Sequence, residues 1–262
     1  MEIIIQDSLE ETSRLAADHV ARLIRNKPNA VLGLATGNTP LHLYKELIRL
    51  HREEGLDFSN VTSFNLDEYL GLAPEHPCSY RHYMNENFFK HINIRLENTH
   101  VPDGLCVGEA IPGHCADYEA AIQAAGGLDL QILGIGSDGH IGFNEPSSSL
   151  ASRTRIKTLT ENTRRDNAFS FGGNIEMVPL HVLTMGIGTI MEAKQILLLA
   201  FGEAKAAAIA AAAEGSITAS NPASILQMHP CAQVFLDAQS ASRLEREDYY
   251  RFIFLEKPDW QK

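Results

Sequence analysis

The chain has 262 residues, of which 44% are hydrophobic and 21% are charged, and its formal net charge is −11 at pH 7. This length and composition suit one large domain spanning residues 1–262, since no shift in composition divides the chain. The negative charge excludes binding to nucleic acid or to an anionic membrane through a general basic surface. We therefore expect a small partner, bound in a local pocket.

The cysteines and the N-terminus indicate a cytoplasmic protein. The four cysteines form no CxxC pair, which favours reduced thiols over a disulfide framework or a zinc site. The apolar start at residues 1–5 is too short for a signal peptide, and no run of about 18 apolar residues predicts a transmembrane helix. The cysteines are Cys78, Cys106, Cys115 and Cys231.

Strand-like and helix-like segments alternate along the chain. In order, the pattern predicts a strand at 2–5, a helix at 9–26, a strand at 30–34, a helix at 40–54, a strand at 61–65, helices at 79–89 and 112–125, strands at 128–135 and 196–201, a helix at 203–214 and a strand at 231–236. Ser8 and Glu11 resemble a capping box for the first helix. Strands separated by such helices predict an α/β fold with a doubly wound, mostly parallel, Rossmann-like sheet covered by helices on both faces. The least regular stretch, 146–178, is expected to be a lid or an interface segment.

A short glycine-containing turn, ATGNTP at residues 35–40, follows the second predicted strand and leads into a helix. Backbone N–H groups and the positive end of the helix dipole would face a phosphate there, with the hydroxyls of Thr36 and Thr39 as further donors. An ordinary N-cap at Thr39 is the alternative, because capping residues are common. The turn lacks the GK[ST] ending of a Walker A motif.

Two adjacent carboxylates, Asp67 and Glu68, follow the third predicted strand. Adjacent residues of an extended segment point in opposite directions, so one side chain can face a cleft while the other caps a helix or forms a pair elsewhere. We expect Asp67 to face the cleft. A solvated or capping aspartate is the alternative, since most aspartates are exposed.

The segment 133–146, LGIGSDGHIGFNEP, places Asp138, His140 and Glu145 in one glycine-rich turn after an apolar run. Ligands of open α/β sheets bind at such strand ends. A histidine titrates near neutral pH, and carboxylates on its ring nitrogens would fix its tautomer and raise its basicity. The turn therefore predicts acid–base chemistry. A metal site is the alternative, but no thiolate or second histidine lies nearby in the sequence, and we expect neither metal nor cofactor.

Lys205 stands in the first turn of the helix predicted at 203–214. Because the helix dipole disfavours a cation at this end, the lysine indicates a bound anion, and a solvated lysine is the alternative. Together the turns predict a phosphate cradle at one end of a crevice and a carboxylate with a histidine at the other. The absence of a dinucleotide fingerprint and of a G-x-S-x-G elbow argues against hydride transfer and serine hydrolysis.

Five segments resemble the glucosamine-6-phosphate deaminases, namely 32–40, 64–72, 133–146, 148–160 and 182–189. The related 6-phosphogluconolactonases share the fold and a DGH turn, but FNEP after that turn and DEY in place of DER favour the deaminases. The resemblance implies isomerisation and deamination of glucosamine 6-phosphate to fructose 6-phosphate, in amino sugar catabolism and without a cofactor. The alternatives are a galactosamine-6-phosphate deaminase, a lactonase and a non-catalytic sugar-phosphate sensor.

The same resemblance implies residue roles. Asp67 would move the proton between C2 and C1, and His140, held by Asp138 and Glu145, would exchange a proton with the ring oxygen. These residue types fit the chemistry, because an enolamine intermediate needs a carboxylate beside C2 and a separate acid–base group at the ring oxygen. The residues that match the phosphate-binding segments are Thr36, Gly37, Asn38, Thr39 and Lys205.

One position departs from the family pattern. Many members hold the substrate phosphate with an arginine where this chain has Phe169. A phenylalanine cannot donate a hydrogen bond, so three explanations are open. Arg164 or Arg165 replaces the arginine, or Lys205 and the backbone hold the phosphate alone, or the substrate differs.

A second ligand site is also implied by the resemblance. In hexameric members an effector, N-acetylglucosamine 6-phosphate, binds between subunits, and Ser148, Ser149, Arg155 and Lys157 match that site. Tyr249 or Tyr250 would contribute, and the chain would form a homo-oligomer. From the residues alone, basic side chains at 153, 155 and 157 can share one face of a strand. A solvated basic strand edge is the alternative.

Overall fold

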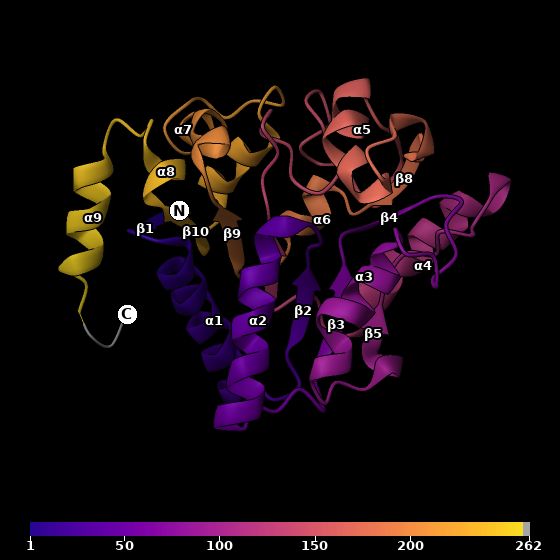
Figure 1. Ribbon diagram of the computed structural model, residues 1–262, viewed down its shortest axis with the longest axis horizontal. Helices are drawn as coiled ribbons and strands as arrows, with labels where there is room; N and C mark the ends of the chain where they lie inside the picture. Colours follow the sequence, from indigo (N-terminus) through magenta and orange to yellow (C-terminus); the bar gives the residue numbers. More distant parts are fainter. Residues whose placement is uncertain (259–262) are drawn as a thin grey trace.

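The computed structural model describes residues 1–258 and is built on a seven-stranded sheet in which every strand pair is parallel (Figure 1). The strand order is β1-β10-β9-β6-β2-β3-β5. The predicted mostly parallel α/β fold is confirmed. The bounds are β1 Glu2–Gln6, β2 Val31–Leu34, β3 Thr62–Asn65, β5 Thr99–His100, β6 Leu130–Leu133, β9 Ile196–Ala200 and β10 Ala232–Asp237.

The five predicted helices are present close to the predicted positions. The first begins as predicted, because the Ser8 hydroxyl accepts a hydrogen bond from the backbone N–H of Glu11 (3.2 Å). The predicted helix at 203–214 starts instead with a 3-10 turn, Glu203–Lys205. The sequence did not predict the helices at 161–167, 187–191, 238–241 and 247–255. The α-helices are α1 Leu9–Asn26, α2 Asn38–Glu54, α3 Tyr80–Asn87, α4 Ile111–Ala124, α5 Glu161–Asn167, α6 Ile187–Met191, α7 Ala206–Ala213, α8 Ala238–Ala241 and α9 Glu247–Leu255.

A second, three-stranded antiparallel sheet lies beside the carboxyl end of the central one, and the sequence did not predict it. Its order is β4-β8-β7, with β4 Asp67–Tyr69, β7 Arg155–Thr158 and β8 His181–Thr184. The stretch 146–178, expected to be irregular, contains β7 and α5 and packs on a small apolar cluster of its own. Asp67 and Glu68 therefore lie on a strand.

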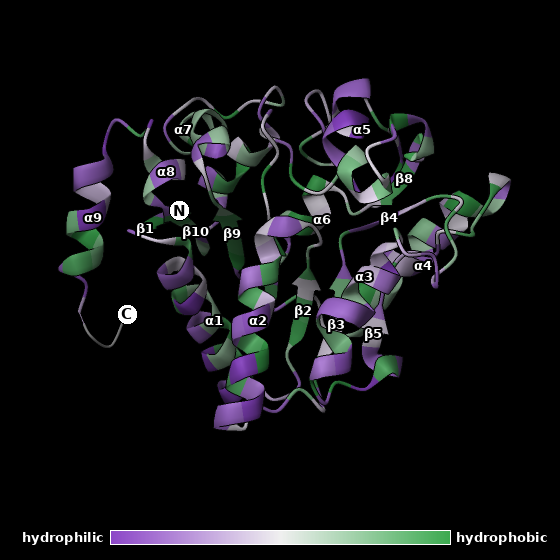
Figure 2. Cartoon of the chain, viewed as in Figure 1, coloured by the Kyte–Doolittle hydropathy of each residue, from purple (hydrophilic) through white to green (hydrophobic). Residues whose placement is uncertain are grey.

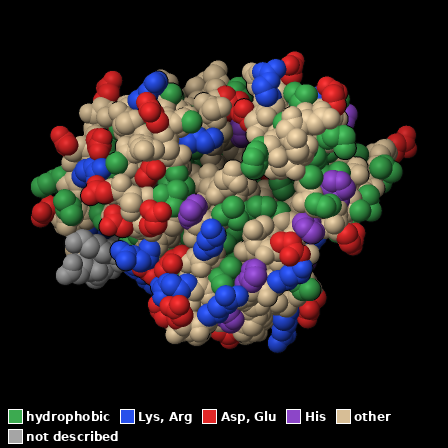
Figure 3. Space-filling view, in the orientation of Figure 1, with side chains coloured by type: hydrophobic (Ala, Val, Ile, Leu, Met, Phe, Trp, Pro, Cys, Tyr) green, Lys and Arg blue, Asp and Glu red, His purple; other side chains and the backbone are tan. Residues whose placement is uncertain are grey.

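The polarity of the chain follows these layers. Figure 2 shows β2 and β9 as apolar, whereas α1 and α2 mix apolar and polar residues because only one face of each helix is buried. On the face drawn in Figure 3, acidic and basic side chains are interspersed. None of the helices within residues 1–258 is long and apolar enough to cross a membrane.

Candidate active site

A cavity of about 160 Å³ lies at the carboxyl ends of β2, β3 and β6. Three of the four predicted turns contribute to it, through residues 35–39, 66–67 and 134–136. This edge of a parallel sheet is where ligands of such folds bind. The other lining residues are Tyr80, His140, Gly142, Phe143 and Asn167.

The turn at residues 35–39 presents the start of α2 to the cavity. The helix begins at Asn38, and its N-cap is Gly37, with φ +99° and no side-chain cap hydrogen bond. The alternative in which Thr39 caps the helix is therefore wrong. The N–H groups of the first turn remain available to an anion, and Thr36, Gly37, Asn38 and Thr39 all line the cavity.

The side chains of Asp67 and Glu68 point in opposite directions, as the alternation along a strand predicts. Asp67 lines the cavity although it is 5% exposed, and no hydrogen bond within the described part of the chain reaches its carboxylate. Burial and, second, the charge of Glu68 raise the pKa of Asp67 to about 8. Glu68 does not line the cavity and instead binds the start of α3.

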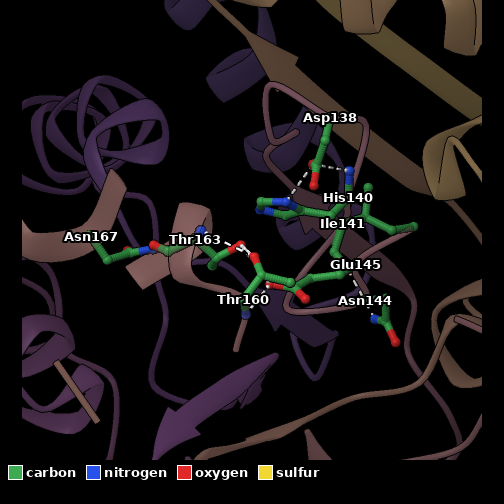
Figure 4. Close-up of polar contacts among 8 residues, drawn as sticks. All are labelled: Asp138, His140, Ile141, Asn144, Glu145, Thr160, Thr163 and Asn167. Carbon is green, nitrogen blue, oxygen red and sulfur yellow. Dashed lines mark hydrogen bonds and ion pairs between the residues drawn. The ribbon is translucent and has the colours of Figure 1, made fainter. Parts of the chain in front are cut away.

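His140 forms a pair with Asp138. Its Nδ1 lies 2.7 Å from Asp138 Oδ1, and its backbone N–H donates to the same oxygen at 3.1 Å (Figure 4). This bond holds the pKa of Asp138 below its usual range. With Nδ1–H donating to Asp138, Nε2 is the ring atom free to exchange a proton. The ring lies so close to Gly136 that a Cβ there would be 2.2 Å from its Cε1.

Glu145 does not hold His140, contrary to the expectation. Its carboxylate accepts hydrogen bonds from the N–H and hydroxyl of Thr160 (both 3.1 Å) and from the hydroxyl of Thr163 (2.5 Å) (Figure 4). A tight turn closed by a bridge between Ile141 and Asn144 separates it from His140. Glu145 therefore anchors the start of α5 to the loop that carries His140.

Lys205 lies at the N-terminus of α7, half-buried, outside the set of residues that line the cavity. Burial lowers the pKa of its ammonium, and the nearby acidic groups are Asp166 and Asp138. No ion pair among the described residues neutralises it. A half-buried ammonium near the His140 turn is a suitable neighbour for a phosphate.

The arginines offered as substitutes for the missing phosphate ligand are already engaged. Arg164 donates to the carbonyls of Val178 (3.1 Å) and Ile175 (2.8 Å), while Arg165 pairs with Glu161 at 2.6 Å. Phe169 is 85% exposed and does not line the cavity. Among the explanations left open by the sequence, replacement by Arg164 or Arg165 is therefore not supported by this geometry.

The candidate effector residues lie around β7. Ser148 is buried and its hydroxyl has no hydrogen-bond partner within residues 1–258, whereas Ser149 is exposed. Arg155 and Lys157 share one face of β7, and Arg155 donates to the side-chain oxygen of Asn144 at 2.8 Å. Asn144 is fully buried beside Glu145, so Arg155 supports the His140 loop as well.

Within one subunit, Arg153, Tyr249 and Tyr250 do not gather with the candidate effector residues. Arg153 pairs with Glu119 (2.5 Å) and Glu192 (2.6 Å), so its charge is neutralised. Tyr249 and Tyr250 lie on α9, at the opposite end of the molecule from β8 and its partner strand β7 (Figure 1). Within one subunit neither tyrosine reaches β7.

Sequence reasoning missed three residues that line the cavity, namely Tyr80, Phe143 and Asn167. The rings of Tyr80 and Phe143 stack at 6.2 Å with an interplanar angle of 11°, and the Tyr80 hydroxyl lies 3.3 Å from that of Tyr69. Tyr80 stands at a predicted helix start and Phe143 lies in the segment 133–146, whereas Asn167 had no local signal. No group of three or more His, Cys, Asp or Glu side chains able to hold a metal gathers within residues 1–258.

A family model of glucosamine-6-phosphate isomerases and 6-phosphogluconolactonases matches residues 6–236. The chain belongs to this family. Within the glucosamine-6-phosphate isomerase/6-phosphogluconolactonase family, it is 54% identical to a glucosamine-6-phosphate deaminase of Arthrobacter sp., over 100% of this chain and 99% of that one.

Solved structures of the family agree with the fold. A monomeric glucosamine-6-phosphate deaminase matches with a TM-score of 0.89 and 45% identity, covering 93% of this chain and 100% of that one. A 6-phosphogluconolactonase from Trypanosoma cruzi matches with a TM-score of 0.72 and 20% identity, covering 93% and 97%. The second likeness concerns the fold alone.

Proposed function

We propose that the chain is a glucosamine-6-phosphate deaminase of amino sugar catabolism, which converts glucosamine 6-phosphate and water to fructose 6-phosphate and ammonia. The observation that carries the proposal is the presence of two separate proton-transfer groups in one cavity. Asp67 is buried there without a hydrogen-bond partner in the described chain, and His140 is oriented by Asp138. High identity to curated deaminases over the whole chain supports the same activity.

Residues in and near the cavity can be assigned to the successive steps of the proposed reaction. The N–H groups at the start of α2 and the Lys205 ammonium would bind the phosphate, which fixes the sugar. Nε2 of His140 would take the proton from O1 and deliver it to the ring oxygen, opening the ring to the aldehyde. Asp67 would take the C2 proton while a proton of the C2 ammonium passes to O1, forming an enolamine. Asp67 would then return its proton to C1, which leaves an iminium at C2. Water would then hydrolyse the C2 imine, supplying the ketone oxygen and releasing ammonia.

The test is a comparison of substrates. Ammonia release and kcat/KM would be measured with glucosamine 6-phosphate and galactosamine 6-phosphate, and hydrolysis would be measured with 6-phosphogluconolactone. We expect the highest kcat/KM for glucosamine 6-phosphate, with activity retained in a chelator because no metal is invoked. Lactone hydrolysis without ammonia release, or binding of the sugar phosphate without turnover, would overturn the proposal.

Lys205→Ala is expected to raise KM about 10- to 100-fold with little change in kcat, since a charge-assisted hydrogen bond to phosphate contributes about 1.5–3 kcal/mol. Initial rates over a range of substrate concentrations give both constants. Lys45→Ala, which removes an equal charge from an exposed position on α2, is the matched control. An unchanged KM in Lys205→Ala would remove Lys205 from the phosphate site.

We also propose that an N-acetylglucosamine 6-phosphate effector binds at Ser148, Ser149, Arg155 and Lys157. The buried hydroxyl of Ser148, which has no partner among the described residues, and the two cations on one face of β7 support this. Because Arg155 also holds Asn144, Lys157 is the more informative position. The effector is expected to lower KM for the wild type, and Lys157→Ala should abolish that response at an unchanged basal rate. An equal response in both proteins would exclude this site.

A homo-oligomer, a hexamer by family resemblance, is part of the same proposal, because the effector site of such members lies between subunits. β7 is an edge strand with an exposed Ile156, beside a cavity of about 520 Å³ that includes Cys115 and Arg155. Light scattering is expected to give the mass of six chains. The mass of one chain, as in the monomeric deaminase it resembles, would contradict the assembly.

A further inference from the structure

Glu68 is a buried carboxylate that the steps above do not use. It lies on β4, is 2% exposed and does not line the cavity. Its oxygens accept four hydrogen bonds, from the Ser79 hydroxyl (2.8 Å) and from the backbone N–H groups of Tyr69 (2.8 Å), Tyr80 (3.0 Å) and Arg81 (3.0 Å). Every one of these bonds is donated to Glu68, which is the pattern that an ionised carboxylate satisfies.

The neighbouring Asp67 has the opposite surroundings, because no hydrogen bond of the described residues reaches its oxygens. Two adjacent buried carboxylates do not ionise together without cost, so the group with more donors carries the charge. Burial raises the pKa of Glu68 as well, but the hydrogen bonds from its four donors oppose this shift, so Glu68 is that group. Before substrate binds, Asp67 keeps its proton, because burial and the charge of Glu68 raise its pKa to about 8.

The other titratable groups that the structure describes nearby do not change which of the two carboxylates is ionised. The titratable groups around Asp67 are the phenols of Tyr69 on β4, Tyr80 on α3 and Tyr118 on α4, together with His140 in the same cavity. The phenols stay neutral, since burial raises their pKa values further. The cation beside Glu68 is Arg81, and its guanidinium is held by Thr99 on β5, at 2.7 and 2.8 Å.

We propose that Glu68 is a positioning residue, which fastens β4 to the start of α3 and keeps Asp67 protonated until a cationic amino sugar binds. The ammonium group at C2 of the substrate would lie beside Asp67 and stabilise its carboxylate, so the Asp67 proton passes to solvent on binding. The same four bonds place Tyr80 in the cavity wall. This inference rests on the proposed function, because the cation is the amine of the proposed substrate.

The test compares the pH dependence of kcat/KM in the wild type, Glu68→Gln and Ser79→Ala. The acid limb reports Asp67 in the free enzyme and is expected near pH 8 in the wild type. Glu68→Gln keeps the shape and removes the charge, so this limb should move to lower pH by about one unit. Ser79→Ala removes one donor but keeps the charge, so it should lower thermal stability and leave the limb in place.

A measurement on the wild type keeps the test decisive if Glu68→Gln does not fold. The acid limb of kcat, which reports the complex, should lie at lower pH than that of kcat/KM, since the bound amine favours the Asp67 carboxylate. Coincident limbs, or a Glu68→Gln enzyme whose limb is unmoved, would overturn the role of Glu68 while leaving the deaminase intact. A wild type that releases no ammonia at any pH would instead refute the proposed function.

Discussion

Asp67→Asn is expected to lower kcat for ammonia release by about 10²- to 10⁴-fold, the usual contribution of a positioned general base. The amide has the size of the carboxylate but cannot take the proton from C2. Because Asp67 makes no hydrogen bond with another described residue, the substitution breaks no hydrogen bond among the described residues. A coupled assay for ammonia, with circular dichroism as the check on folding, measures the loss. A rate near that of the wild type would remove Asp67 from the mechanism.

The stability of Asp67→Asn gives an independent check of its burial. The Asp67 carboxyl has a pKa of about 8 in the folded protein, against 3.8 for the ordinary group. Between these pH values the folded state holds a proton that the unfolded state has lost, so wild-type stability falls as pH rises through this window. The variant lacks this dependence. Urea unfolding at pH 5 and pH 8 should therefore show Asp67→Asn gaining stability relative to the wild type at the higher pH.

His140→Gln is expected to lower kcat/KM by about 10²- to 10⁴-fold, because the ring oxygen loses its acid–base group while the phosphate cradle is untouched. The glutamine can still reach Asp138 but cannot exchange a proton near neutral pH. His181→Gln, at an exposed position at the start of β8, is the matched control and should retain the wild-type rate.

A second variant distinguishes the contribution of the His140 imidazole itself from the contribution of its orientation by Asp138. Asp138→Asn keeps the imidazole but removes the carboxylate that lies 2.7 Å from Nδ1, so the tautomer with a free Nε2 is no longer favoured. The kcat/KM of Asp138→Asn should be lower than that of the wild type, as expected for His140→Gln. Full activity in both variants would mean that ring opening does not depend on this pair.

Six of the seven strands of the central sheet were predictable because they are short, largely apolar runs between helices. The seventh, β5, consists of two polar residues, Thr99–His100, and was not predicted. The antiparallel sheet was not, since β4 is only three residues, Asp67–Tyr69, and two of them are carboxylates that are rare in strands. The other two strands of this sheet, β7 and β8, come more than 80 residues later in the chain, and the pairing of β4 with β8 has no local signature.

The candidate site was likewise predictable only where its contacts are local in the sequence. The opposite directions of Asp67 and Glu68 followed from strand alternation, and the Asp138–His140 pair followed from sequence proximity. Proximity misled for Glu145, whose partners Thr160 and Thr163 lie beyond β7. Local pattern predicted which turns form the cavity, whereas the side chains that complete it from α3 and α5 depend on tertiary packing.

The most direct test of the deaminase assignment is the product balance of the wild-type protein acting on glucosamine 6-phosphate. Ammonia and fructose 6-phosphate would be quantified in the same samples over time. The cavity with Asp67 and the Asp138–His140 pair predicts equal molar amounts of the two products. Consumption of the substrate without ammonia, or no consumption at all, would contradict the account.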